Sequence, residues 1–118
     1  MTQMTFLPAT PADMVEEYAV VTEQEGTGAL YIKLIYEEMQ EFIESTEPEH
    51  DLKELADLVY VLYGYARVKG YKLDEAVARV HKNNMGRMRQ PDGTILRRED
   101  GKIIKCPEYP QVELGDLV

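Results

Sequence analysis

Hydrophobic residues recur at helical spacing in four segments of the chain, with turn-forming residues between them. The first segment follows Thr10-Pro11-Ala12-Asp13. Thr is a common N-cap, Pro suits the first helical turn, and Asp interacts favourably with the positive end of the helix dipole. The pattern therefore predicts a first helix that ends at the turn signal Glu25–Gly28.

Two longer helices are predicted next, over about Leu30–Ser45 and Asp51–Lys69, with the segment Ser45–His50 as the break. Gly70 stands where a C-terminal cap is expected. After Asp57, the later helix is apolar nearly all round, so neighbouring elements must cover most of its sides. A chain of 118 residues has few elements for this purpose. We therefore expect a homo-oligomer, either a dimer or a tetramer.

A fourth helix is predicted from Leu73 or Asp74 to about Gly86, and the periodicity then changes. Two short β-prone runs flank Asp100-Gly101 and predict a hairpin over 94–105. The last residues read as an extended arm that lies over a neighbouring subunit or over a site. The expected fold is an all-α four-helix bundle with a short C-terminal β-hairpin and an extended tail. We expect one domain over 1–118, with the helical core at 11–88 and the hairpin and arm at 91–118.

Composition narrows the classes of partner and compartment. The net charge of −9 argues against a nucleic-acid partner, because phosphate binding needs clustered Lys and Arg. The longest apolar run, Leu55–Ala66, is short and contains Asp57, so no membrane span is expected. Residues 1–13 show no secretory signal, and the single cysteine, Cys106, forms no internal disulfide. We expect a cytoplasmic protein in which Cys106 is an inert surface thiol.

Five carboxylates lie within the core-forming segments. Glu37, Glu38 and Glu41 belong to the second predicted helix, and Glu54 and Asp57 belong to the third. Residues three or four apart share a helix face, so an antiparallel pair of helices would bring these groups together. Two carboxylates about 5 Å apart repel by roughly 3 kcal/mol at an effective dielectric near 20. A hard divalent cation such as Mg²⁺ or Mn²⁺ would neutralise the group.

A simpler interpretation applies to some of these acids. Glu is a good helix former, and adjacent glutamates on a solvated face are common. For Glu37 alone, a surface position is the more common case. Asp57 is different, because it lies inside the apolar run, where an unpaired carboxylate is costly.

The acidic pattern resembles a known family signature. Glu37-Glu38-Met39-Gln40-Glu41, then twelve residues, then Glu54-Leu55-Ala56-Asp57 is similar to the EExxE…ExxD motif of the all-α nucleoside triphosphate pyrophosphohydrolases. That group contains MazG, the dimeric dUTPase/dCTPase enzymes and phosphoribosyl-ATP pyrophosphohydrolase. The similarity covers roughly Leu30–Met88. The later sequence resembles a phage-type MazG-like branch that includes the MazZ enzymes, which hydrolyse dGTP or GTP.

This resemblance implies a reaction and a ligand set. It implies hydrolysis of a nucleoside triphosphate between the α and β phosphates, which yields a monophosphate and pyrophosphate. Magnesium, with manganese as a substitute, would be held by Glu38, Glu41, Glu54 and Asp57. Glu37 is expected to be a ligand, a base or a structural residue. Glu38 or Glu41 is the candidate catalytic residue that positions the attacking water.

Substrate-binding residues are predicted with less support from the sequence. Basic groups must approach the polyphosphate, and the candidates are Lys33, Lys82 and Arg87, although Lys33 also suits an ion pair with Glu37. Asn84 is a candidate because a buried amide can hydrogen-bond a sugar, phosphate or carboxylate. The base pocket is expected to use the first helix and its following loop, with Tyr18, Met14 and Thr22 as candidates.

The predicted function is therefore Mg²⁺-dependent nucleoside triphosphate pyrophosphohydrolysis, with a purine substrate and with dGTP or GTP first. One alternative is phosphoribosyl-ATP as the substrate. Another, from a different class, is a non-catalytic acidic protein that mimics DNA or serves as a dimerisation module.

Overall fold

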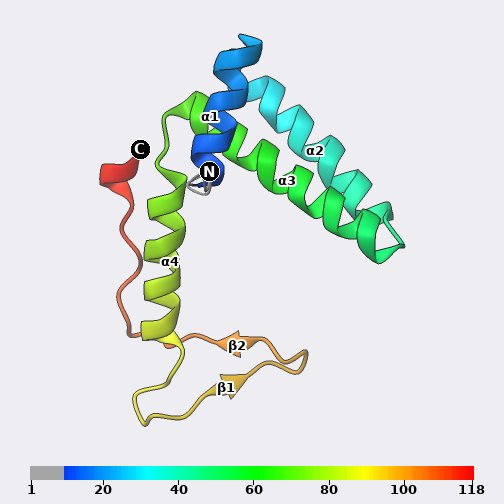
Figure 1. Ribbon diagram of the computed structural model, residues 1–118. Helices are drawn as coiled ribbons and strands as arrows, with labels where there is room; N and C mark the ends of the chain where they lie inside the picture. The colour runs from blue at the N-terminus through cyan, green and yellow to red at the C-terminus, as the bar shows by residue number, and fades with distance from the viewer. Residues whose placement is uncertain (1–9) are drawn as a thin grey trace, which may run out of the picture. The chain divides into compact units, whose positions relative to one another are not determined.

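A computed structural model describes residues 10–118 (Figure 1). The absence of a secretory signal was predicted largely from residues 1–9, which lie outside the described residues. The chain forms two compact units, the first reaching Asp74 and the second covering Glu75–Leu117. We describe each unit by itself, and the single-domain organisation stays a prediction. Within residues 10–118 the elements are those of the predicted class, with four α-helices and one small hairpin.

Helix α1 covers Pro11–Thr22 and begins as predicted. The hydroxyl of Thr10 accepts a hydrogen bond from the backbone N–H of Asp13 at 3.2 Å. The helix ends at Glu23, which adopts a left-handed conformation with φ of 56°. Non-glycine residues rarely take this conformation, which explains why the sequence indicated a later end, at Glu25–Gly28.

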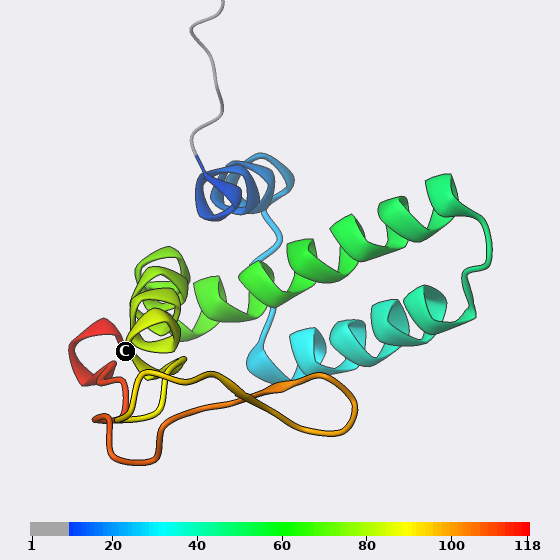
Figure 2. The same cartoon turned by 90° about the horizontal axis from the view of Figure 1, so that it is seen from below.

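Helices α2 and α3 form an antiparallel hairpin, which Figures 1 and 2 both show. Helix α2 covers Gly28–Glu44, and the hydroxyl of Thr27 caps it. Helix α3 covers Pro48–Lys69 and ends at Gly70 in a left-handed cap. The predicted start of α3 at Asp51 was therefore wrong by three residues. Pro48 is the first helical residue, because proline is preorganised for that position, so the connection is shorter than predicted.

The core of the first unit lies where α1 and α2 pack against α3. Its buried residues include Val15 and Ala19 on α1, Tyr31 on α2 and Leu58 on α3. The ring of Tyr31 lies against the backbone of Gly64, and a Cβ at Gly64 would overlap that ring. A glycine on α3 therefore makes the space that a buried tyrosine on α2 occupies.

Helix α3 retains exposed apolar side chains within the single chain. Leu52 is 66% exposed and Leu55 is 42% exposed, while Val59 and Leu62 have similar exposure to Leu55. This agrees with the sequence pattern, in which one chain has too few elements to cover α3. The oligomer itself stays a prediction.

The second unit contains most of α4, which covers Leu73–Arg87, and a two-stranded hairpin. Strand β1 (Leu96–Arg97) pairs antiparallel with β2 (Ile103–Ile104). The predicted turn at Asp100-Gly101 joins them, with Gly101 at a positive φ of 92°.

The C-terminal tail returns along α4 of the same chain, ending in a 3₁₀ turn at Gly115–Leu117. The backbone N–H of Cys106 donates to the carbonyl of Arg87 at 2.7 Å, and the Asn83 amide donates to the carbonyl of Pro110 at 2.9 Å. These contacts fix the arm on its own helix, whereas the sequence suggested a neighbouring subunit or a site. Cys106, which was expected at the surface, is buried in this tail.

No helix within residues 10–118 is long and apolar enough to cross a membrane.

Candidate active site

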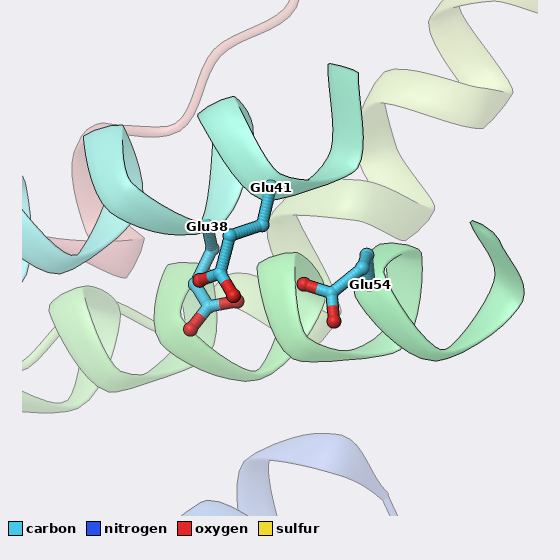
Figure 3. Close-up of side chains that lie close together, drawn as sticks. All are labelled: Glu38, Glu41 and Glu54. Atoms are coloured by element: carbon cyan, nitrogen blue, oxygen red, sulfur yellow. The ribbon is translucent and has the colours of Figure 1, made fainter. Parts of the chain in front are cut away.

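Three carboxylates converge between α2 and α3. Glu38 and Glu41 are one turn apart on α2, and Glu54 reaches toward them from α3 (Figure 3). One oxygen from each of these three groups lies within 4.8 Å of the other two. The antiparallel hairpin therefore brings together side chains that are separated by twelve residues of sequence. We call Glu38, Glu41 and Glu54 the carboxylate cluster.

Two oxygens of the carboxylate cluster are buried without a partner. Glu54 is 2% exposed, and its Oε2 has no hydrogen-bond partner among the described residues. The Oε2 atom of Glu38 is also buried and has no hydrogen-bond partner within residues 10–118. Buried carboxylate oxygens are costly unless they are hydrogen-bonded, paired or bound to a metal.

The electrostatics of the cluster are repulsive. Burial raises the pKa of Glu38 above its usual range, and repulsion from Glu41, Asp57 and Glu54 raises it further. The nearby Lys53 ammonium acts in the opposite direction. A divalent cation would satisfy the unpartnered oxygens and remove the repulsion. Because the donors are all carboxylate oxygens, the site fits a hard ion such as Mg²⁺ or Mn²⁺.

Lys53 is a residue that the sequence reasoning missed. Its Nζ lies 2.6 Å from Oδ2 of Asp57 and 3.3 Å from Oε1 of Glu54. The hydrogen bond to Asp57, followed by the one to Glu54, raises the pKa of Lys53, so its ammonium stays charged. The structure thus places Asp57 in an ion pair beside the carboxylate cluster. The signal was present in the sequence, because Lys53 is adjacent to Glu54 and four residues before Asp57.

The other predicted ligand and phosphate-binding residues lie outside the carboxylate cluster. Glu37 and Lys33 are exposed on α2. Lys82, Asn84 and Arg87 lie on α4 in the second unit. Their predicted roles stay predictions.

A cavity of about 300 Å³ in the first unit is lined in part by Glu38 of the carboxylate cluster and by Asp57. Its polar and aromatic lining consists of Tyr18, Gln24, Tyr31, Glu38, Asp57 and Tyr60. The rings of Tyr18 and Tyr60 meet edge to face, with their centroids 5.8 Å apart. The structure therefore places the predicted residue Tyr18 in a cavity whose lining includes both carboxylates and aromatic rings. Gln24 and Tyr31 were not foreseen from the sequence.

Two other candidates for the base pocket, Met14 and Thr22, do not line this cavity. Met14 lines an adjoining hollow that shares Tyr18 and Tyr60 with the cavity. The hydroxyl of Thr22 donates to the backbone carbonyl of Tyr18 at 2.7 Å, so this side chain is used within α1. The neighbouring tyrosine Tyr63 is used locally too, because its hydroxyl donates to Asp74 at 2.7 Å.

Comparisons with known proteins agree with this geometry. A family model described as phosphoribosyl-ATP pyrophosphohydrolase matches residues 6–84. A solved structure, the cyanophage S-2L MazG-like pyrophosphohydrolase bound to dGDP and three catalytic Mn²⁺ ions, has the same fold, with a TM-score of 0.61. The match is 24% identical and covers 86% of this chain and 97% of that chain. No match is found among curated proteins. The chain therefore belongs to the phosphoribosyl-ATP pyrophosphohydrolase family, with the MazG-like all-α fold, and is a nucleotide pyrophosphohydrolase.

Proposed function

We propose that this protein hydrolyses a nucleoside triphosphate, in a Mg²⁺-dependent reaction, to a nucleoside monophosphate and pyrophosphate. The observation that carries the proposal is the pair of buried, unpartnered oxygens on Glu38 and Glu54, of which Glu38 lines a cavity of about 300 Å³. A cation site that opens into a cavity with aromatic walls suits a ligand with a polyphosphate and a base. The dGDP and Mn²⁺ ions in the structurally similar cyanophage enzyme support the same assignment.

The carboxylates hold the metal in this proposal. Glu38, Glu41 and Glu54 supply oxygens from the cluster, and Asp57 joins them when its ion pair with Lys53 opens. Glu37 remains a proposed ligand with less support, because it is exposed and lies outside the cluster. When bound, Mg²⁺, or Mn²⁺ as a substitute, neutralises the carboxylates and stabilises charge that develops on the phosphates.

The chain's own residues position the water and the nucleotide. Glu38 or Glu41 orients a water molecule for in-line attack on phosphorus and accepts its proton. The new P–O bond forms as the bridging bond between the α and β phosphates breaks, and pyrophosphate leaves. Tyr18 and Tyr60 provide an apolar wall against which a base can pack. Of the predicted phosphate-binding and amide residues, we retain Lys33, Lys82, Arg87 and Asn84 as proposals.

The preferred substrate is proposed to be a purine nucleotide, with dGTP or GTP first. The resemblance to the phage-type branch and the dGDP bound to the cyanophage enzyme both support this choice. A second candidate substrate is phosphoribosyl-ATP, which the description of the matching family favours.

A product analysis separates these substrates. The purified protein would be incubated with Mg²⁺ and each of the eight canonical nucleoside triphosphates, and in parallel with phosphoribosyl-ATP. We expect pyrophosphate release that EDTA abolishes, with the highest kcat/KM for dGTP or GTP. Faster turnover of phosphoribosyl-ATP would select the second candidate. Release of inorganic phosphate alone, or no release from any substrate, would refute the proposed reaction.

A further inference from the structure

Gln24 lines the cavity and has no role in the proposed reaction. It follows Glu23, whose left-handed conformation ends α1, and its backbone N–H donates to the carbonyl of Ala19 at 3.1 Å. This backbone geometry turns the chain at the end of α1, and the Gln24 side chain contributes to the cavity wall.

The amide of Gln24 has a defined orientation. Its Nε2 donates to the hydroxyl oxygen of Tyr31 at 3.0 Å. Tyr31 is itself 7% exposed, and its ring is confined against Gly64. A buried aromatic ring with little room to move therefore anchors one side of the amide.

The anchored amide keeps hydrogen-bonding capacity. A carboxamide has two N–H donors and one carbonyl acceptor, and the bond to Tyr31 uses one donor. No described residue bonds to Oε1 of Gln24, and this oxygen is not among the buried atoms that lack a partner. One N–H donor and the carbonyl acceptor of Gln24, a residue that lines the cavity, therefore remain unused by the described residues.

This arrangement matches the edge of a nucleobase. The side-chain amide of Gln or Asn can pair with a base through two parallel hydrogen bonds, one donated and one accepted. The remaining lining of the cavity divides by chemistry. Glu38 and Asp57 are proposed metal ligands, whereas Tyr18 and Tyr60 offer ring surfaces. Gln24 is the carboxamide in this lining.

We propose that Gln24 reads the edge of the substrate's base and sets base selectivity, and that Tyr31 is the positioning residue that orients the Gln24 amide. This inference rests on the proposed function, because it requires a nucleotide with its phosphates at the carboxylates. It adds a specificity residue on the loop between α1 and α2, where the sequence had indicated only the general location of the pocket.

The test compares a substrate that has a base with one that lacks it. We would measure kcat/KM of the wild type and Gln24→Leu for the preferred nucleotide and for ribose 5-triphosphate. Gln24→Leu keeps the size of the side chain but removes both hydrogen-bonding groups. It should lower kcat/KM for the nucleotide roughly 10- to 100-fold, as expected for a lost paired contact to a base. Turnover of ribose 5-triphosphate should be unchanged.

Three further measurements separate base reading from a structural role. Mn²⁺ binding, followed by titration calorimetry, should be the same in Gln24→Leu and the wild type. Tyr31→Phe keeps the ring against Gly64 but removes the hydroxyl, so it should raise KM for the nucleotide more than it lowers kcat. Gln40→Leu changes an exposed glutamine on α2 outside the cavity and serves as the matched control.

The outcomes distinguish this inference from the proposed function. An equal loss of kcat/KM for both substrates in Gln24→Leu, or no loss for either, would overturn the role of Gln24 while leaving pyrophosphohydrolysis intact. A wild-type protein that binds Mn²⁺ but turns over no nucleotide would overturn the proposed function and this inference together. If Gln24→Leu does not fold, Gln24→Glu replaces it. That variant replaces both amide N–H donors with a carboxylate oxygen that can accept a hydrogen bond from the Tyr31 hydroxyl, and it should change the order of preference among the four bases.

Discussion

A carboxylate cluster in the first unit and a single carboxylate in the second have opposite surroundings. In the first unit, Glu38 and Glu54 each have a buried oxygen without a partner, and both lie in a group of mutually repelling acids. In the second unit, Asp116 is bound through both oxygens by the guanidinium of Arg79, at 2.6 and 2.7 Å. The first arrangement leaves two buried oxygens without a hydrogen-bond partner among the described residues, whereas both oxygens of Asp116 are bound by Arg79. A buried carboxylate without a hydrogen-bond partner is therefore a better indicator of a metal site than a carboxylate in an ion pair.

A helical glycine accommodates a tyrosine ring in each unit, but the two tyrosines have different roles. Gly64 makes room for Tyr31, which orients a residue of the cavity, while Gly86 makes room for Tyr109, which fixes the tail. The packing device is the same in both units, but the first serves a binding site and the second serves a terminal segment. The following changes test whether this division of roles is correct.

The largest effect is expected for Glu54→Gln. Loss of this charge removes a cluster oxygen that has no other partner, so Mn²⁺ affinity should fall about 100-fold or more. Hydrolysis should fall with it, while the metal-free protein stays folded because the repulsion among the acids decreases. Calorimetric titration with Mn²⁺ measures the affinity, and Glu44→Gln, an exposed change at the end of α2, is the control. Undiminished Mn²⁺ binding by Glu54→Gln would place the metal elsewhere.

Gly64→Ala should destabilise the first unit by about 1–3 kcal/mol, a typical cost of overpacking a core. The added Cβ would overlap the Tyr31 ring and force it away from α3. Chemical denaturation measures the change in the free energy of unfolding. Gly86→Ala provides the matched change in the second unit, since it would displace Tyr109 instead. Gly86→Ala should leave Mn²⁺ affinity unchanged. A loss of Mn²⁺ binding in Gly86→Ala would contradict the separation of roles.

A smaller effect is expected for Lys53→Met. The Lys53 ammonium contacts both Glu54 and Asp57 and competes with a metal ion for their oxygens. Its removal should raise Mn²⁺ affinity roughly two- to fivefold, in line with the modest strength of exposed ion pairs. The melting temperature of the metal-free protein should decrease at the same time. Lys69→Met, an exposed change in the last turn of α3, is the control for loss of one positive charge. Weaker Mn²⁺ binding by Lys53→Met would show that Lys53 assists the metal.

The smallest effect is expected for Arg79→Lys. Lysine keeps the charge but cannot form the two parallel bonds to Asp116. Amide hydrogen exchange of residues 109–117 should become faster because the tail is held less firmly, whereas Mn²⁺ affinity and nucleotide turnover should not change. Hydrogen-exchange mass spectrometry measures this. Unaltered exchange in the tail would show that the contacts of Asn83 and Cys106 are sufficient to hold it.

Local signals in the sequence predicted the elements of this protein. The cap at Thr10, the glycine at Gly70 and the turn at Asp100-Gly101 were all visible as residue types at the correct positions. Such features depend on a few neighbouring residues, so they can be predicted without knowledge of packing. The boundary errors occurred where two local signals competed, as at Pro48, or where a non-glycine residue took a left-handed conformation, as at Glu23.

The sequence by itself determined which helices carry the acids, because the periodicity of the apolar residues around Glu38, Glu41 and Glu54 indicates two helices separated by a break. Only the tertiary structure decided which acids meet, because convergence depends on how α2 and α3 pack. It also decided that the Gln24 amide bonds to the Tyr31 hydroxyl and that Cys106 is buried. These are contacts between side chains on different turns or elements, and a linear pattern does not specify side-chain direction at such distances.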